Sequence, residues 1–324
     1  MCTAITYKTK DNYFGRNLDI EFSYNETVTI TPRNYPFRFR KMGEMNQHFA
    51  IIGMAYVYDN YPLYYDATNE KGLSIAALNF PENAVYTPFF EGKENITPFE
   101  LIPWILGQCS TTKDAECLLS KINLLNENFS HNLPLSPLHW IISDKDTSIT
   151  LECTKDGMRV YDNPYGVLTN NPPFDFHLHN INNYQSLHEG AAANNLNKSL
   201  PLENYSLGMG AMYLPGDFSS ASRFVKAVFV KEKSVCDGSE KESVNQFFHI
   251  LQSVAMPMGC VMTPSGEFEY TRYSCCCNTD TQVYYYTTYQ NMTIGKVNLH
   301  DVDLDSATLY SFPDSFQRGG ILYG

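Results

Sequence analysis

The 324-residue sequence lacks any long apolar run, and no segment approaches the roughly 18 consecutive apolar residues of a membrane-spanning helix. Its first residues, MCTAITYK, have neither the basic start nor the apolar stretch of a signal peptide. Basic residues are also few, since 23 Lys and Arg stand against 35 Asp and Glu, for a net charge of −12. These shortages argue against nucleic-acid binding and stable membrane association, and they predict a cytoplasmic protein.

Metal-binding and nucleotide-binding motifs are absent as well. The nine cysteines are odd in number and form no CxxC pair, which favours free thiols over disulfides or a zinc site. His177 and His179 would share a face of an extended strand, but no third ligand accompanies them. The run 275–277 (CCC) is interpreted as buried small residues, because neighbours on a strand point to opposite faces. The residues therefore indicate no zinc site, and they include no HExxH or P-loop motif.

Strand and helix signals occur in separate blocks along the chain. β-branched residues near the N-terminus and apolar runs flanking polar turns predict strands at residues 3–7, 139–143, 148–153, 269–277 and 282–290. A capping box at Thr97 and Glu100 predicts a helix at 98–107. Other caps and apolar residues at helical spacing predict three more helices, at 112–122, from a cap at Ser220, and at 244–254 before Pro257.

This order of hairpins and paired helices is typical of an α+β fold rather than of a doubly wound sheet. Two stacked antiparallel sheets between helical layers would satisfy it. No repeat or long linker divides the chain, so residues 1–324 are predicted to form a single domain. The polar stretch 188–204 is the most loop-like segment, and we interpret it as an excursion that serves assembly.

Cys2 is the first candidate for chemistry. Removal of Met1, which is favoured when the next residue is small, would give Cys2 both a thiol and a free α-amine. An α-amine has a pKa of roughly 7.7–8.0 and can take the proton of the thiol, so nucleophile and base would belong to one residue. Taken alone, however, Cys2 is better interpreted as an ordinary cysteine at a frayed terminus.

Four polar segments supply candidate partners. Arg16 and Asp19 suggest an ion pair in which Arg16 would favour a thiolate and Asp19 would accept a hydrogen bond from an α-ammonium. Asn79 and Asn170 could stabilise an oxyanion, although Asn shortly before Pro also fits a turn. Arg223 lies in the first turn of a predicted helix, where a cation opposes the helix dipole, so a partner elsewhere is expected.

In combination, the motifs resemble the choloylglycine hydrolase family of N-terminal-nucleophile hydrolases, and most closely its bile salt hydrolases. The resemblance extends nearly from end to end of the chain. It rests on MCTAIT at the start, YFGRNLD at 13–19, NEKGLSIAALNFP at 69–81, PFELIPWILGQCS at 98–110, PLHWIISD at 137–144, YGVLTNNPPFD at 165–175, LPGDFSSASRFVKA at 214–227 and FFHIL at 247–251.

The resemblance implies a four-layer αββα fold and a homotetramer in the cytoplasm of a gut bacterium. It implies hydrolysis of the amide that joins a bile acid to glycine or taurine, through a thioester and without a cofactor. The implied catalytic set is Cys2 as nucleophile, Arg16 near the sulfur, Asp19 orienting the α-amine, Asn170 and the backbone N–H of Asn79 as oxyanion hole, and Arg223 completing the polar network.

The implied acyl pocket is apolar, as a steroid requires. Rival activities within the same class are penicillin V hydrolysis and acyl-homoserine lactone cleavage, and a rival of another class is a non-catalytic protein that senses redox state or binds steroids. By motif position, the pocket would be lined by Leu18, Tyr24, Tyr58, Tyr65, Phe129 and Leu133.

Overall fold

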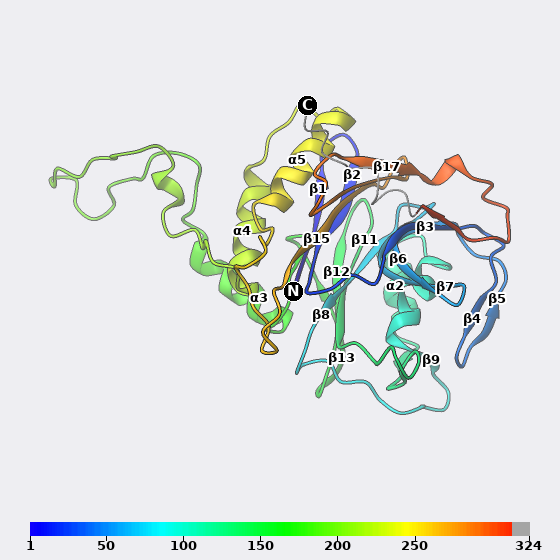
Figure 1. Ribbon diagram of the computed structural model, residues 1–324. Helices are drawn as coiled ribbons and strands as arrows, with labels where there is room; N and C mark the ends of the chain where they lie inside the picture. The colour runs from blue at the N-terminus through cyan, green and yellow to red at the C-terminus, as the bar shows by residue number, and fades with distance from the viewer. Residues whose placement is uncertain (313–324) are drawn as a thin grey trace.

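The computed structural model describes residues 1–312 as two large antiparallel sheets packed face to face, with helices on both outer faces (Figure 1). This αββα arrangement confirms the predicted fold class. One apolar cluster fills the space between the sheets and extends under α4 and α5, and a second lies between the eight-stranded sheet and α1 and α2. Within residues 1–312, no helix is long and apolar enough to cross a membrane.

The six-stranded sheet carries the N-terminus in its interior. This sheet is covered on both faces, so consecutive residues of a strand can all be buried. The free thiols of residues 275–277 are an example, with at most 1% exposure, and their predicted burial is confirmed. Gly15 is required here, since a Cβ at this position would lie 1.9 Å from the carbonyl oxygen of Cys275. The strand order is β14 (Val167–Leu168), β1 (Cys2–Lys8), β2 (Asn12–Ile20), β15 (Tyr270–Asn278), β16 (Val283–Thr288) and β17 (Gly295–Asn298).

The eight-stranded sheet supplies the opposite wall of the inter-sheet space. Its strands follow the order β13 (Gly157–Asp162), β12 (Ser148–Thr154), β11 (Leu138–Ser143), β8 (Ser74–Asn79), β7 (Tyr61–Asn69), β6 (Ile51–Tyr58), β3 (Thr27–Thr31) and β18 (Tyr310–Phe312). Two small sheets flank it, one of β4 (Phe37–Phe39) with β5 (Gly43–Met45) and one of β9 (Glu94–Ile96) with β10 (Ile122–Leu124). Both predicted hairpins, β11–β12 and β15–β16, are confirmed.

The helices divide between the two faces. The six-stranded sheet is covered by α4 (Ser220–Lys233) and α5 (Glu240–Gln252), with α3 (Phe174–Asn180) against α4. The eight-stranded sheet is covered by α1 (Leu101–Leu106) and α2 (Thr112–Leu119), and the predicted capping box at Thr97 precedes a first turn of 3₁₀ geometry, η1 (Pro98–Glu100). Three further 3₁₀ turns are η2 (Ile181–Tyr184), η3 (Met209–Ala211) and η4 (Leu299–Asp301).

Several predicted boundaries were wrong. The helix expected at 112–122 ends at Leu119, because Ile122 begins a strand that pairs with β9. The cap of α4 is Ser219, whose hydroxyl accepts from the N–H of Ser222, and not Ser220. His177 lies in helix α3 rather than on a strand, so it does not share a face with a residue two positions away.

Residues 185–216, hereafter the arm, project from the body between η2 and α4 (Figure 1). The arm includes the predicted loop 188–204 and contains only the short η3 as regular structure. Hydrogen bonds within the arm join Ala192 to Asn204 and Gly210 to Gly190. The arm lies away from the two sheets in Figure 1, and several of its apolar residues are exposed, with Leu196 at 81% and Leu207 at 100%.

Candidate active site

Cys2 begins strand β1, which lies between β14 and β2 and therefore has its backbone fixed on both sides. The residue is 3% exposed. Its N–H donates to Oδ1 of Asn170 at 2.7 Å, and its carbonyl oxygen accepts from Nη1 of Arg223 at 2.5 Å. The thiol-bearing residue is thus held by two of the predicted partners, which are 168 and 221 positions away in the chain.

Met1 precedes Cys2 in this structure, so the nitrogen of Cys2 is a peptide N–H and not yet an amine. The N-terminal ammonium of Met1 donates to the carbonyl oxygen of Asp19 at 2.8 Å and pairs with the carboxylate of Glu269. Burial lowers the pKa of this ammonium, and the nearby Cys2 and Asp19 oppose that change. The initiator residue therefore lies inside the site, directly beside the thiol.

The expected ion pair between Arg16 and Asp19 does not form within residues 1–312. Residues three apart on strand β2 point to opposite faces, so the two side chains diverge. Arg16 is fully buried and donates from Nη1 to the carbonyl oxygens of Tyr65, at 3.0 Å, and Ala77. Burial by itself lowers the pKa of Arg16, but Cys2 and the other acidic groups around it raise it overall.

Asp19 instead lies near Arg223 and Thr271. Its Oδ1 accepts from the Thr271 hydroxyl at 2.6 Å, whereas its buried Oδ2 accepts no hydrogen bond from residues 1–312. Burial raises the pKa of Asp19 above its ordinary value, and Arg223, followed by the N-terminal ammonium, opposes that change in part. An unsatisfied buried carboxylate oxygen beside the start of β1 is suited to an ammonium donor.

Arg223 has the partner that its position in a helix predicted. It is 1% exposed and donates to the hydroxyl of Thr3 at 2.6 Å and to Oδ1 of Asn170 at 2.8 Å, besides its bond to Cys2. Burial lowers the pKa of Arg223, and the charge of Asp19 opposes this. Its guanidinium therefore links α4 to β1 and orients the Asn170 side chain.

The two asparagines lie next to each other. Nδ2 of Asn170 donates to the carbonyl oxygen of Asn79 at 2.7 Å, which leaves the second N–H of that amide for another acceptor. Because the N–H of Phe80 donates to Pro137, Asn79 and Leu138 form a non-hydrogen-bonded pair, and the N–H of Asn79 points away from β11. Asn170 thus links the backbone of Cys2 to the backbone of Asn79, so both asparagines adjoin the start of β1.

A buried His139–Glu152 pair braces both asparagines, and the sequence did not single it out. Nδ1 of His139 is 3.0 Å from Oε1 of Glu152, and Nε2 is 2.9 Å from the carbonyl oxygen of Thr169, the residue before Asn170. The imidazole also stacks on Phe80, the residue after Asn79, with centroids 4.3 Å apart. The only signal available was a polar residue inside the apolar strand PLHWIISD.

A cavity of about 340 Å³ opens onto Cys2, Arg16 and Asn79. This volume falls within the roughly 300–1,000 Å³ of small-molecule sites. Tyr58 is not among the residues that line it; this side chain is 37% exposed and contacts Phe129 edge to face, with ring centroids 5.8 Å apart. Of the other expected residues, the cavity is lined by Leu18, Tyr24, Tyr65, Phe129 and Leu133, and it also contacts Tyr56, Leu63, Phe99, Ile102 and residues 134–138, which the sequence did not indicate.

Comparisons with known proteins find relatives along nearly the whole chain. A model of linear amide C–N hydrolases of the choloylglycine hydrolase family matches residues 2–312. A bile salt hydrolase/transferase of Lactiplantibacillus plantarum is 53% identical, over 97% of this chain and 97% of its own. A conjugated bile acid hydrolase of Lactobacillus gasseri is 39% identical, over 96% of this chain and 100% of its own.

Solved structures show the same fold. A conjugated bile acid hydrolase from Clostridium perfringens superimposes with a TM-score of 0.89 at 35% identity, over 96% of each chain. A penicillin V acylase from Agrobacterium tumefaciens gives 0.76 at 18% identity, over 96% of this chain and 90% of its own, which is evidence of the fold alone. The αββα architecture is that of the N-terminal-nucleophile hydrolases. Within this class, the chain belongs to the choloylglycine hydrolase family.

Proposed function

We propose that this protein hydrolyses the amide bond of glycine- or taurine-conjugated bile salts, with the thiol of Cys2 as nucleophile. The observation that carries the proposal is the position of Cys2 at an apolar cavity, between two asparagine donors and beside an unsatisfied oxygen of Asp19. The cavity is walled largely by Tyr, Phe and Leu side chains, which suit a rigid hydrocarbon skeleton. The names of the relatives point to the same substrate class.

The chemistry begins once Met1 has been removed. The α-amine of Cys2 takes the thiol proton, and the sulfur attacks the amide carbonyl carbon. The developing oxyanion accepts hydrogen bonds from the N–H of Asn79 and from the second Nδ2–H of Asn170. The α-ammonium then protonates the leaving nitrogen as the C–N bond breaks, which releases glycine or taurine and leaves a thioester.

Water completes the cycle by the reverse proton path. The α-amine takes a proton from water, the resulting hydroxide attacks the thioester, and the sulfur leaves with the proton returned by the ammonium. Oδ2 of Asp19 orients the α-amine, Arg16 favours the thiolate, and Arg223 keeps Asn170 in place. This chain of proton transfers needs no metal or cofactor.

A side-by-side assay tests the substrate. We expect the processed enzyme to release glycine or taurine from conjugated bile salts faster than it releases 6-aminopenicillanic acid from penicillin V or homoserine lactone from an acyl-homoserine lactone. The matched blank is the Cys2→Ser protein, which keeps the cavity. Faster release from penicillin V would reassign the protein to that activity, and saturable bile salt binding without amine release would indicate a steroid-binding protein.

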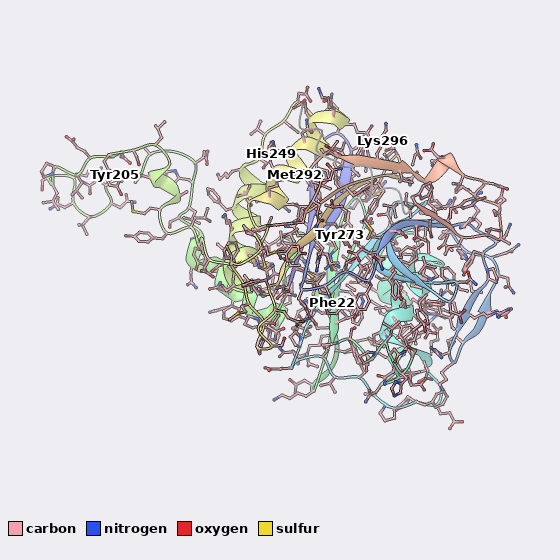
Figure 2. All side chains as sticks on the ribbon, in the orientation of Figure 1. Phe22, Tyr205, His249, Tyr273, Met292 and Lys296 are labelled. Carbon is pink, nitrogen blue, oxygen red and sulfur yellow. The ribbon has the colours of Figure 1, made fainter. Side chains whose placement is uncertain are left out.

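We also propose that four copies assemble through the arm, in the cytoplasm of a gut bacterium. The arm carries apolar side chains that no part of residues 1–312 covers, among them Tyr205, which is 80% exposed and lies far from the body in Figure 2. Exposed apolar groups of this kind mark interaction surfaces. Sedimentation equilibrium of the processed enzyme is expected to give the mass of a tetramer, and a variant with Leu202→Ser and Leu207→Ser should dissociate. A monomeric wild type would contradict the proposal.

A further inference from the structure

A buried carboxylate lies behind the active site, outside the cavity. Asp66 on β7 is 2% exposed and is not among the residues that line the cavity. Its Oδ2 accepts from the hydroxyl of Tyr273 at 2.6 Å, and its Oδ1 accepts from the hydroxyl of Tyr284 at 2.7 Å and the thiol of Cys275 at 3.3 Å. All three donors belong to the opposite sheet, so Asp66 spans the inter-sheet space, where Tyr273 is seen in the middle of the molecule (Figure 2).

The geometry favours an ionised Asp66. Both oxygens are occupied as acceptors, and a carboxylate, unlike a carboxylic acid, can accept at every position. Burial raises the pKa of Asp66 above its ordinary value, and Arg16 together with the hydroxyls of Tyr273 and Tyr284 opposes that change in part. Two tyrosine hydroxyls and two thiols also face Asp66. Burial raises the pKa of each of them, so they are neutral: Tyr273, Tyr284, Cys275 and Cys277.

Within residues 1–312, Arg16 is therefore the cation that acts on Asp66. Cys275, which donates to Asp66, is also the register partner of Arg16 across β2 and β15. Tyr65, whose carbonyl oxygen accepts from Arg16, is the extra residue of a β-bulge in β7 and directly precedes Asp66. β-Bulges redirect backbone groups next to active sites. Here the bulge directs the carbonyl oxygen of Tyr65 to Arg16 and is followed directly by the carboxylate of Asp66.

The most deeply buried charges near the nucleophile form a set of four. The guanidiniums of Arg16 and Arg223 are matched by the carboxylates of Asp19 and Asp66, each no more than 2% exposed. Removing one partner of such a set leaves a buried charge uncompensated. In the processed enzyme, the thiolate and ammonium of Cys2 would add one charge of each sign, and the less buried carboxylate of Glu269 at the cavity wall is a further negative charge.

We propose that Asp66 is a positioning residue, whose carboxylate is the counter-charge of Arg16 and limits the positive potential that Arg16 exerts on the Cys2 thiol. This inference rests on the proposed role of Cys2 as nucleophile. Asp66 lies outside the cavity and therefore touches no substrate. It acts instead through Arg16 and through the bulge at Tyr65. Without its charge, Arg16 would stabilise the thiolate too strongly, and a thiolate formed at lower pH is a weaker nucleophile.

The variant Asp66→Asn tests this role, because it removes the charge and keeps the size. A more positive potential favours loss of a proton from both the thiol and the α-ammonium, so the acidic limb of the kcat/KM profile is expected to move to lower pH by ~1 unit. The value of kcat should fall about threefold, as the Brønsted dependence of thiolate reactivity implies. KM should stay within about twofold, because Asp66 lies outside the cavity.

The pH dependence of iodoacetamide alkylation at Cys2 gives a second readout that needs no bile salt. It is measured in processed protein carrying Cys117→Ser and Cys260→Ser, which removes the exposed thiols. The alkylation limb should move with the kcat/KM limb. If the enzyme proved not to cleave bile salts, this readout would still decide the role of Asp66.

The matched control is Thr68→Val, on the same face of β7. Thr68 is 1% exposed and bonds Ser74 at 2.8 Å, so the variant breaks a buried polar contact without removing a charge. It should lower the melting temperature and leave both pH limbs in place. If Asp66→Asn does not fold, Asp66→Ser replaces it, because Ser also removes the charge, and both pH limbs should move in the same direction. Unmoved limbs in the folded variant would overturn the proposal.

Discussion

Replacement of Cys2 by Ser is expected to reduce bile salt hydrolysis by at least about 10³-fold, the scale seen when a nucleophile is removed from an enzyme. The hydroxyl of Ser has a far higher pKa than a thiol, so the α-amine can no longer generate the nucleophile at neutral pH. The surroundings should persist, because Asn170 and Arg223 bind the backbone of residue 2 and not its sulfur. Release of glycine or taurine under saturating substrate is the measurement.

Two controls make this result specific. Ser is as small as Cys, so Met1 should still be removed, and mass spectrometry of the purified variant verifies it. Cys117→Ser changes an exposed thiol on α2 and should leave hydrolysis within about twofold, as surface substitutions generally do. Activity of Cys2→Ser within tenfold of the wild type would mean that the nucleophile lies elsewhere.

Retention of Met1 is expected to have an effect of similar size while leaving the thiol intact. The nitrogen of Cys2 is then a peptide N–H, which donates to Asn170 and has no basic lone pair for the thiol proton. Met1 also lines the cavity, where its ammonium pairs with Glu269 and bonds Asp19. Both the base and the access of substrate to the sulfur are therefore lost.

Protein made while methionine aminopeptidase is inhibited provides the unprocessed form, and its mass reports the fraction that keeps Met1. Activity should follow the processed fraction linearly, with the residual activity of fully unprocessed protein at most about 10⁻³ of the processed value. Insertion of Gly between Met1 and Cys2 gives a matched variant in which the amine is displaced by one residue. Full activity in either form would exclude the α-amine of Cys2 as the base.

The predictions that held are those that depend on neighbouring residues in the chain. The capping box at Thr97 and the polar turns of the two hairpins act within a few positions, and local chemistry determines them. The error at 112–122 arose where distant parts of the chain compete for the same residues. Ile122 became a strand because β9 offered it a partner.

Cys2 remained ambiguous as a single residue, and the order of motifs along the sequence determined the family before any contact was known. Only the tertiary structure decided how the site is built. Alternation along β2 sends Arg16 and Asp19 to opposite faces, and sheet register together with helix packing brings Arg223 to Cys2 across 221 positions. The charge of Asp66 beside Arg16 has the same origin, because residues on two different sheets meet only when those sheets stack.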